Sequence, residues 1–349
     1  MRNRTRHLLL LALLVLPGAA SAGQNGVTDG KKGLKQSDEK NAPSPPKGVE
    51  NWKALDDIKS GLQPRPPFEV SSDEEPKFVR QLVRVQWRTG DPIDLWIMRP
   101  KLPGKVHVVL YLYSYPADPS QFRDNGWGER ATADGFAAVG FVSALTGQRY
   151  FARPMKQWFV SELTESLGSS VHDVQLVLNY LADRGDMDVN DVGMFGMGSG
   201  ASIAVLAARA DARIKVLDLV DPWGDWPEWL RESPVIAEDE RSRYITPEFL
   251  QSVAPLDPIA YLPSLRTTRV IRVQQMLSDP VTPKSAKERI AASLTDPRLL
   301  ERYADAELFM KARQADGLSG WIKQQLKARM QNDNQSPGLA ARDSGSPRN

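Results

Sequence analysis

The sequence predicts an α/β fold, in which a mostly parallel sheet carries helices on both faces. Two observations predict it. Between residues 51 and 330, nearly continuous apolar runs, which are typical of buried strands, alternate with segments of helical periodicity. Ahead of them, residues 79–87 and 93–98 flank a polar turn and predict an antiparallel hairpin. Strands that alternate with helices pair in parallel, because each helix returns the chain across the sheet.

Each later element follows from its own pattern. Strands are expected where apolar residues are nearly continuous, at residues 107–113, 136–142, 192–195, 214–220 and 270–277. Helices are expected where apolar residues recur at helical spacing, at residues 127–134, 170–182, 199–210, 284–294 and 318–330. Ser170, with Asp173 three residues later, has the spacing of a capping box and predicts a helix start.

Residues 222–265 interrupt the alternation of strands and helices. The segment contains Trp223, Trp226 and Trp229 at a spacing of three, and it predicts a helical cap inserted above the sheet. The tryptophans either pin the cap onto the domain, which we favour, or line the mouth of a pocket and stack on a sugar ring or an aromatic ligand. Asp221 ends the preceding strand on the side where open α/β sheets bind ligands, so it is a candidate contact residue.

The two ends of the chain differ from its middle. A basic start, nine apolar residues (8–16) and an A-x-A end predict a signal peptide over residues 1–22, cleaved after Ala22. Export to the periplasm or the medium follows, with no stable membrane anchor after cleavage. Polar, Gly- and Pro-rich composition predicts a disordered linker over residues 23–50 and a disordered tail over residues 331–349. The folded domain is expected at residues 51–330.

Charge and composition exclude several partners. Removing Arg2, Arg4 and Arg6 with the signal lowers Lys+Arg from 45 to 42, against 43 acidic residues, so the mature charge is about −1. Such a chain is not expected to bind nucleic acid. It has no cysteine, which excludes a cysteine nucleophile and cysteine metal ligands. Neither a metal nor another cofactor is expected.

The most specific motif is residues 192–204, VGMFGMGSGASIA, in which an apolar run, a cluster of glycines and a small-residue helix follow one another. This order predicts a sharp turn from strand to helix that exposes the residue at its apex. With the later turn Asp279 to Pro283, DPVTP, the chain from about residue 75 to 330 resembles the α/β-hydrolase superfamily, in its secreted esterase, dienelactone-hydrolase-like and peptidase-like branches. The resemblance implies a nucleophile elbow at residues 196–200 and a triad acid at Asp279.

The sequence departs from that family at two of the three triad positions. Gly198 stands where the nucleophile belongs. The family histidine follows the acid, but no histidine follows Asp279, and residues 304–317 contain none. His7 lies in the predicted signal, His107 in a strand as an edge or core residue, and His172 near a helix start as a surface residue. The sequence therefore predicts a hydrolase fold without hydrolase machinery.

The remaining site could still bind a ligand. The amides of Ser199 and Gly200 at the helix start, together with Tyr113 and Ser114 after the strand at 107–113, could hold a carboxylate, an ester carbonyl or a phosphate. Further expected ligand-binding residues, from neighbouring strand ends and the cap, are Met197, Asp221 and Trp223. We therefore expect a non-catalytic exported protein, with a small acyl, carboxylate or sugar-like ligand.

Two alternatives stay open at this point. Ser199 could be a displaced nucleophile of a weak esterase or peptidase, with Asp279 as partner and Lys311 or Lys284 as base. Against this, a serine at a helix start is usually a capping hydroxyl. The cap and tails could also make the protein a scaffold that contacts another envelope protein.

Overall fold

The computed structural model describes residues 50–56, 65–88, 91–115, 117, 119–144, 159–294, 296, 299–316 and 319–335. The expected signal peptide, most of the linker and the tail beyond residue 335 lie outside these residues. The last helix continues to Gln335, past the expected end of the domain at residue 330.

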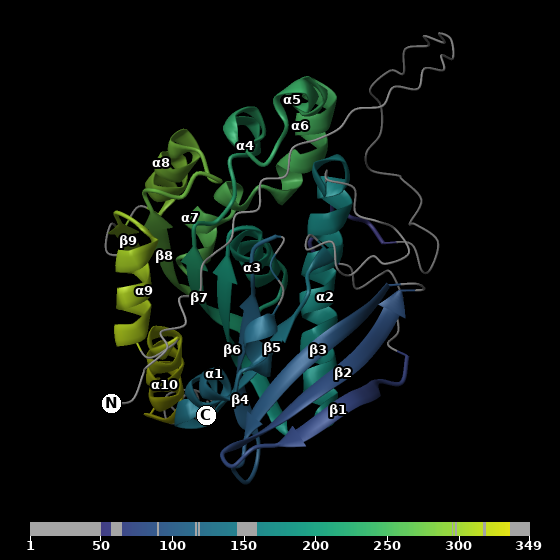
Figure 1. Ribbon diagram of the computed structural model, residues 1–349, viewed down its shortest axis with the longest axis vertical. Coiled ribbons are helices and arrows are strands. Elements are labelled where there is room, and N and C mark those ends of the chain that lie inside the picture. Colours follow the sequence, from purple (N-terminus) through teal and green to yellow (C-terminus); the bar gives the residue numbers. More distant parts are fainter. Residues whose placement is uncertain are drawn as a thin grey trace, which may run out of the picture. The chain divides into compact units, whose positions relative to one another are not determined.

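A nine-stranded sheet forms the centre of the described chain (Figure 1), in the order β1-β2-β3-β5-β4-β6-β7-β8-β9. The pairs β1–β2, β2–β3 and β3–β5 are antiparallel, and the strands from β5 to β9 pair in parallel. The strands are β1 (Phe68–Glu74), β2 (Phe78–Arg88), β3 (Asp91–Pro100), β4 (Val106–Leu112), β5 (Phe136–Phe141), β6 (Met187–Met197), β7 (Ile214–Val220), β8 (Val270–Met276) and β9 (Leu300–Tyr303). The mostly parallel sheet and its N-terminal hairpin, β2–β3, are confirmed.

The sequence does not reveal the two edge strands. Every residue of β1 is exposed, so β1 lacks the alternation of buried and exposed residues that identifies a half-buried strand. β9 has only four residues, none of them fully buried. Edge strands pair on one side only, so backbone hydrogen bonds with β2 and β8 fix them while their side chains carry little pattern.

Helices cover both faces of the sheet. α2, α3 and α8 pack on one face, in a core that includes Val171, Ile203 and Ile290. α1, α9 and α10 pack on the other, in a core that includes Trp127, Phe309 and Ile322. The helices are α1 (Asn125–Ala131), α2 (Leu163–Arg184), α3 (Ser199–Ala210), α4 (Trp226–Glu232), α5 (Glu238–Tyr244), α6 (Pro247–Val253), α7 (Leu262–Leu265), α8 (Lys284–Ser293), α9 (Ala306–Ala315) and α10 (Gly320–Gln335). No helix in the described ranges combines the length and apolarity needed to cross a lipid bilayer.

Two helices differ from the expectation. α2 begins at Leu163, seven residues before Ser170, so the capping-box interpretation is wrong. The Ser170 hydroxyl instead donates to the carbonyl of Ser166 at 2.7 Å and accepts from the amide of Ala144 at 3.1 Å, so it joins α2 to the segment that follows β5. α9 lies within residues 304–317, for which no helix was expected, and the Asp305 carboxylate caps it by accepting from the amide of Leu308.

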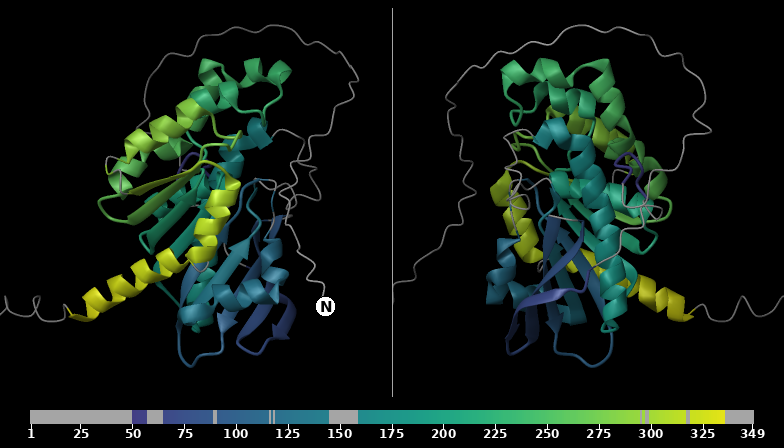
Figure 2. Two further views of the ribbon diagram at one scale, coloured as in Figure 1. Left: turned by 60° about the vertical axis from the view of Figure 1, so that its left-hand side comes forward. Right: turned by 90° about the vertical axis from the view of Figure 1, so that its right-hand side faces the viewer.

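The segment after β7 folds into short helices, α4 to α7, with 3₁₀ turns at Ala254–Leu256 and Pro258–Ala260. Figures 1 and 2 show α4, α5 and α6 at one end of the sheet. Trp226 and Trp229 are almost fully buried and belong to the same core as α2 and α3. The Trp226 indole donates to the carbonyl of Leu256 at 2.8 Å, and the Asp257 carboxylate accepts from the amides of Asp225 and Trp226. The tryptophans therefore pin these helices to the domain.

A buried charge cluster fastens residues 50–56 to α2. The Glu50 carboxylate pairs with the Arg88 guanidinium at the end of β2, which also pairs with Asp173 of α2. The His172 ring contacts the Glu50 carboxylate at 2.9 Å and the Ala54 carbonyl at 2.8 Å. Burial opposes ionisation of Glu50, but the hydrogen bonds from Arg88 and His172 outweigh it and lower its pKa. We call these residues with Trp52 the N-terminal clasp.

The N-terminal clasp corrects two expectations. His172 is 2 % exposed and lies in the middle of α2, so it is not a surface residue at a helix start. Its ring stacks on Trp52, with centroids 6.2 Å apart. Glu50, expected to belong to the linker, is buried and pairs with Arg88.

Candidate functional site

The turn between β6 and α3 has the backbone of a nucleophile elbow. Gly198 has φ 52° and ψ −118°, a conformation in which a side chain would be strained. The neighbouring glycines let the strand and the helix approach closely: a Cβ on Gly196 would lie 2.5 Å from the Cα of Ala201, and one on Gly200 would overlap the carbonyl of Leu112. The backbone of this turn therefore resembles a nucleophile elbow, but the residue at its apex, Gly198, has no side chain.

The Ser114 side chain occupies the space beside Gly198. A Cβ at residue 198 would overlap the Ser114 hydroxyl oxygen and lie 2.7 Å from the Ser114 Cβ. It would also lie 3.1 Å from the indole nitrogen of Trp223. Ser114 follows β4 and Trp223 follows β7, so the strand ends on either side of β6 both close over the apex. A side chain at residue 198 has no room unless Ser114 moves.

The amides that could form an oxyanion hole are bonded within the protein. In hydrolases the hole uses the amide after the nucleophile and one from the loop that follows a neighbouring strand. Here the Ser199 amide donates to the Ser114 hydroxyl at 3.4 Å, and the Tyr115 amide donates to the Ser199 hydroxyl at 2.9 Å. Ser199 is fully buried. Ser114 and Ser199 thus supply internal acceptors where a substrate oxyanion would bind.

The Asp279 carboxylate caps its own turn. It accepts from the amides of Val281 at 3.2 Å and Thr282 at 3.1 Å. Lys287 of α8 is buried beside it, 3.3 Å from the Asp279 carboxylate. The Lys287 ammonium also donates to the carbonyls of Met276 and Asp279, at 2.7 and 2.8 Å. Asp279 therefore contacts an ammonium group in place of a histidine.

Asp221 joins this cluster from the end of β7. It is 4 % exposed with φ 42°, and one carboxylate oxygen accepts from the amide of Met276 at 2.9 Å. The same oxygen lies 3.9 Å from the Lys287 ammonium, and the second oxygen has no hydrogen-bond partner among the described residues. Burial and the charge of Asp279 raise the pKa of Asp221 to about 7, with Lys287 opposing the rise. Two carboxylates thus share one buried cation.

The raised pKa of Asp221 makes stability depend on pH. An acid whose pKa is higher in the folded than in the unfolded state holds its proton more tightly when folded, so stability falls as pH rises from about 4 to 7. We expect Asp221→Asn, which keeps an oxygen for the Met276 amide, to exceed the wild type in unfolding free energy at pH 8 by about 1 to 4 kcal/mol. Urea unfolding at pH 5 and pH 8 measures this. At pH 5 the two proteins should be nearly equal, and the same difference at both pH values would contradict the prediction.

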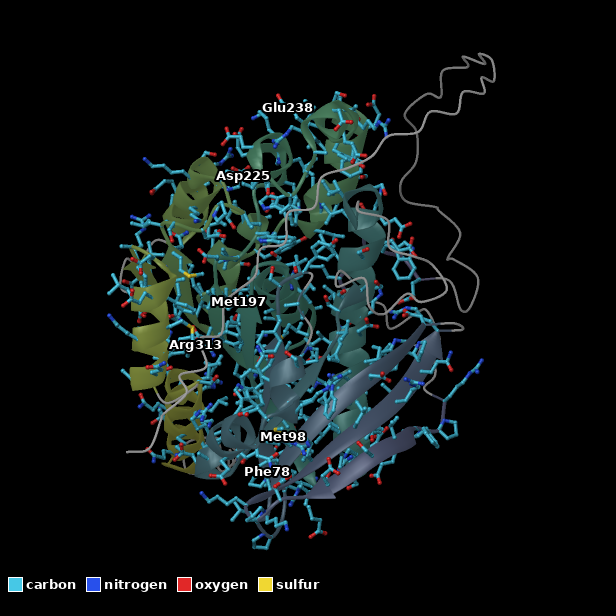
Figure 3. The ribbon with its side chains drawn as sticks, in the orientation of Figure 1. Phe78, Met98, Met197, Asp225, Glu238 and Arg313 are labelled. Atoms are coloured by element: carbon cyan, nitrogen blue, oxygen red, sulfur yellow. The ribbon has the colours of Figure 1, made fainter. Side chains whose placement is uncertain are left out.

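The structure places the expected ligand-binding residues at four positions. Ser114, Ser199 and Trp223 meet at Gly198, where the Trp223 amide donates to the Gly198 carbonyl at 3.3 Å. Asp221 belongs instead to the cluster with Asp279. Met197, half-buried at the end of β6, lies below Asp225 of the cap in Figure 3. Tyr113 faces the core of α1 and α10, with its ring 6.2 Å from that of Phe195. Of the expected ligand-binding residues, the structure thus brings Ser114, Ser199 and Trp223 together at Gly198.

No imidazole serves the site in the described part of the chain. His107 is half-buried at the start of β4, the end remote from Ser114, and His172 belongs to the N-terminal clasp. The two lysines considered as bases are exposed: Lys284 begins α8, and Lys311 of α9 pairs with Glu307 at 2.7 Å. Within the same ranges, no group of three or more His, Asp or Glu residues could hold a metal ion.

Sequence reasoning missed Lys287 and the role of Ser114. Lys287 lies three residues beyond the helix start at Lys284, and it has no motif that would separate it from exposed lysines. Its burial depends on the carbonyls of Met276 and Asp279, which the fold brings to α8. Ser114 was recognised as a candidate, but only the structure shows its side chain against Gly198.

Neither the known family profiles nor the sequences of curated proteins match this chain. Solved structures do. Acetyl xylan esterase 1 from Thermoanaerobacterium sp. JW/SL YS485 is similar with a TM-score of 0.56 and 16 % identity, covering 73 % of this chain and 86 % of that one. The acetyl xylan esterase from Paenibacillus sp. R4 is similar with a TM-score of 0.55 and 16 % identity, covering 73 % of this chain and 88 % of that one. A cold-adapted esterase from an Arctic intertidal metagenomic library is similar with a TM-score of 0.50 and 11 % identity, covering 74 % of this chain and 96 % of that one.

The strand order, the elbow between β6 and α3, and these similarities agree with one another. Because the sequence identities are only 11–16 %, these similarities establish a shared fold and not a shared activity. The chain has the fold of the α/β-hydrolase superfamily.

Proposed function

We propose that this chain is a non-catalytic α/β-hydrolase-fold protein that binds a small ligand and does not hydrolyse esters. One observation carries the proposal: the Ser114 side chain fills the place of the missing side chain at Gly198 and accepts from the Ser199 amide. The apex glycine and the closed oxyanion hole are thus two parts of one rearrangement.

The known rate losses of serine hydrolases that lack a catalytic residue favour a non-catalytic protein over a weakened enzyme. Loss of the nucleophile or the base of a serine hydrolase lowers turnover by about 10⁶-fold. The remaining rate, about 10³ to 10⁴ over water, depends on an oxyanion hole and on substrate binding. Here the Ser199 and Tyr115 amides are already bonded to Ser114 and Ser199. The proposal therefore predicts that even this residual rate is absent.

Ser199 is poorly placed to act as the nucleophile. Its oxygen accepts from the Tyr115 amide, and its side chain is fully buried. Neither a histidine nor a lysine within the described residues bonds to its hydroxyl. A nucleophile needs an adjacent base or a lowered pKa. We therefore prefer a structural role for Ser199, as the acceptor that holds the loop after β4.

The test is covalent labelling. We expect no labelling by a fluorophosphonate probe and no turnover of p-nitrophenyl acetate above the buffer rate, in the wild type and in Ser199→Ala alike. Ser199→Ala should lower the unfolding free energy by about 1 kcal/mol, because the Tyr115 amide loses its acceptor. Ser202→Ala, at the next buried serine of α3, is the matched control. Labelling of the wild type that disappears only in Ser199→Ala would overturn the proposal.

Export belongs to the same proposal. The basic start and the apolar run at residues 8–16 support a signal peptide cleaved after Ala22. N-terminal sequencing of the protein recovered from the periplasm or the medium should begin at Gly23. A product that keeps residues 1–22 would contradict it.

A further inference from the structure

In the N-terminal clasp, both ring nitrogens of His172 face oxygen atoms. Nδ1 lies 2.9 Å from a carboxylate oxygen of Glu50, and Nε2 lies 2.8 Å from the carbonyl oxygen of Ala54. A carbonyl oxygen accepts hydrogen bonds and never donates them, so Nε2 must carry a proton. The charge of the ring therefore depends on whether Nδ1 carries a proton as well.

The Glu50 carboxylate is ionised, so it has no proton to donate to Nδ1. Its two oxygens accept from two nitrogens of the Arg88 guanidinium, which is the forked pairing that a guanidinium forms with a carboxylate. Burial opposes ionisation of Glu50, but the hydrogen bonds from Arg88 and His172 outweigh it and lower its pKa. Nδ1 must therefore donate too, and a histidine ring that donates from both nitrogens is an imidazolium.

The Trp52 ring contacts this cation and a second one. The His172 ring stacks on it with planes at 24° and centroids 6.2 Å apart, and the Arg88 guanidinium carbon lies 5.7 Å from its centre. Because the face of an indole attracts cations, Trp52 favours the charged form of the histidine. Gly168 of α2 leaves room for the same segment, since a Cβ there would overlap the Trp52 carbonyl.

The described charged groups around the ring come from four elements of the fold. They are Glu50 of the N-terminal segment, Arg88 of β2, Asp91 of β3 and Asp173 of α2. Burial opposes ionisation of Arg88, but Asp173 and Glu50 outweigh it and raise its pKa, so the guanidinium stays charged. An exposed histidine loses its second proton at about pH 6.5. Measurements between pH 6 and pH 9 therefore address the ring.

We propose that closure of the N-terminal clasp takes up a proton on His172, so that residues 50–56 detach from α2 as the pH rises above about 7. The neutral ring has one donor for two buried acceptors, and an acceptor left without a donor opposes closure. An equilibrium that takes up one proton weakens about tenfold for each pH unit above the titration of the open form. This inference does not depend on the proposed function, because the elbow residues take no part in it.

The test is trypsin cleavage after Lys53, an exposed residue of this segment, at pH 6 and at pH 9. Each rate is divided by the rate for a synthetic peptide of residues 48–56 at the same pH, which removes the pH dependence of trypsin itself. When the clasp recloses faster than trypsin cuts, the divided rate reports the population of the open form. We expect it to rise at least tenfold from pH 6 to pH 9 in the wild type. Equal divided rates at the two pH values overturn the proposal.

Two variants assign the effect to one histidine. His172→Gln replaces the ring with an amide that does not titrate, so its divided rate should be the same at pH 6 and pH 9. His107→Gln is the matched control, because His107 is half-buried at the start of β4, beside Asp188 and away from the clasp. This control should keep the rise of the wild type. A rise that persists in His172→Gln, or that disappears in His107→Gln, contradicts the assignment.

Heteronuclear NMR of the histidine rings detects the proton without relying on cleavage. At pH 7.5 an exposed ring is mostly neutral. The His172 ring should instead show protons on both Nδ1 and Nε2, and both should exchange slowly with water because the side chain is 2 % exposed. A ring that carries a proton on one nitrogen only would refute the proposal, whatever the cleavage rates are.

Discussion

Gly198→Ser is expected to lower the unfolding free energy by about 2 to 6 kcal/mol and to produce no esterase activity. Two costs combine. A side chain at φ 52° costs about 1 to 3 kcal/mol, and forcing Ser114 aside adds about 1 to 3 kcal/mol. Restoring the hydroxyl supplies no base, because no histidine follows Asp279 in the sequence and the Asp279 carboxylate contacts Lys287. Urea unfolding and p-nitrophenyl acetate hydrolysis measure the two effects.

Two controls separate strain from crowding. Gly185 has φ 79° with no atom within 4 Å of a Cβ, so Gly185→Ala should cost only the strain, about 1 kcal/mol. The double variant Gly198→Ser with Ser114→Gly removes the overlap and should recover part of the stability, still without turnover. Turnover by either serine variant would reveal a base that this structure does not assign.

Arg88→Met should destabilise the protein by about 3 to 5 kcal/mol, because the buried carboxylates of Glu50, Asp91 and Asp173 all lose their pairing with this cation. The side chains of Glu50 and Asp173 are 3 % and 0 % exposed, and Arg88 pairs with both. The Trp87 indole still donates to Asp173 at 3.0 Å, but it carries no charge. The N-terminal clasp should also open, which trypsin cleavage at Lys53 reports.

Arg84→Met is the matched control for this prediction. Arg84 lies on the same strand and pairs with Asp94, but both side chains are about half exposed. Exposed pairs contribute about 0 to 1 kcal/mol, so this variant should unfold close to the wild type. Equal destabilisation by the two arginine variants would show that burial of the cluster is not what stabilises residues 50–56.

The central helices and strands were predictable because buried positions need apolar residues, which gives these elements a recognisable sequence pattern. α3 and β7 have the bounds that the sequence predicts, since their residues are nearly all apolar and buried. α2 was cut short because Ser170 has the spacing of a helix cap, and Ser166 and Ser169 interrupt the apolar pattern before it although tertiary contacts bury them. α9 was missed because its only fully buried residue is Phe309.

The site was predictable in position but not in contacts. The glycines of residues 196–200 place the elbow, since close backbone approach requires them. Which partner meets Asp279 or Gly198 depends on strands and helices far apart in sequence. Ser114 is 84 residues before Gly198, and no local pattern specifies that its side chain fills the apex. The pairing of His172 with Glu50, 122 residues away, has the same origin.

The shared core beneath the segment after β7 constrains how any molecule reaches the sheet. Lifting α4 away would carry Trp226 and Trp229 into water and break the indole bond to Leu256. Burying each such ring is worth several kcal/mol, so the segment should unfold together with the domain and not swing on a hinge. A small molecule must therefore reach the ends of the strands by passing beside this segment, which does not move. Which molecules can enter would then depend on the fixed shape of the protein surface.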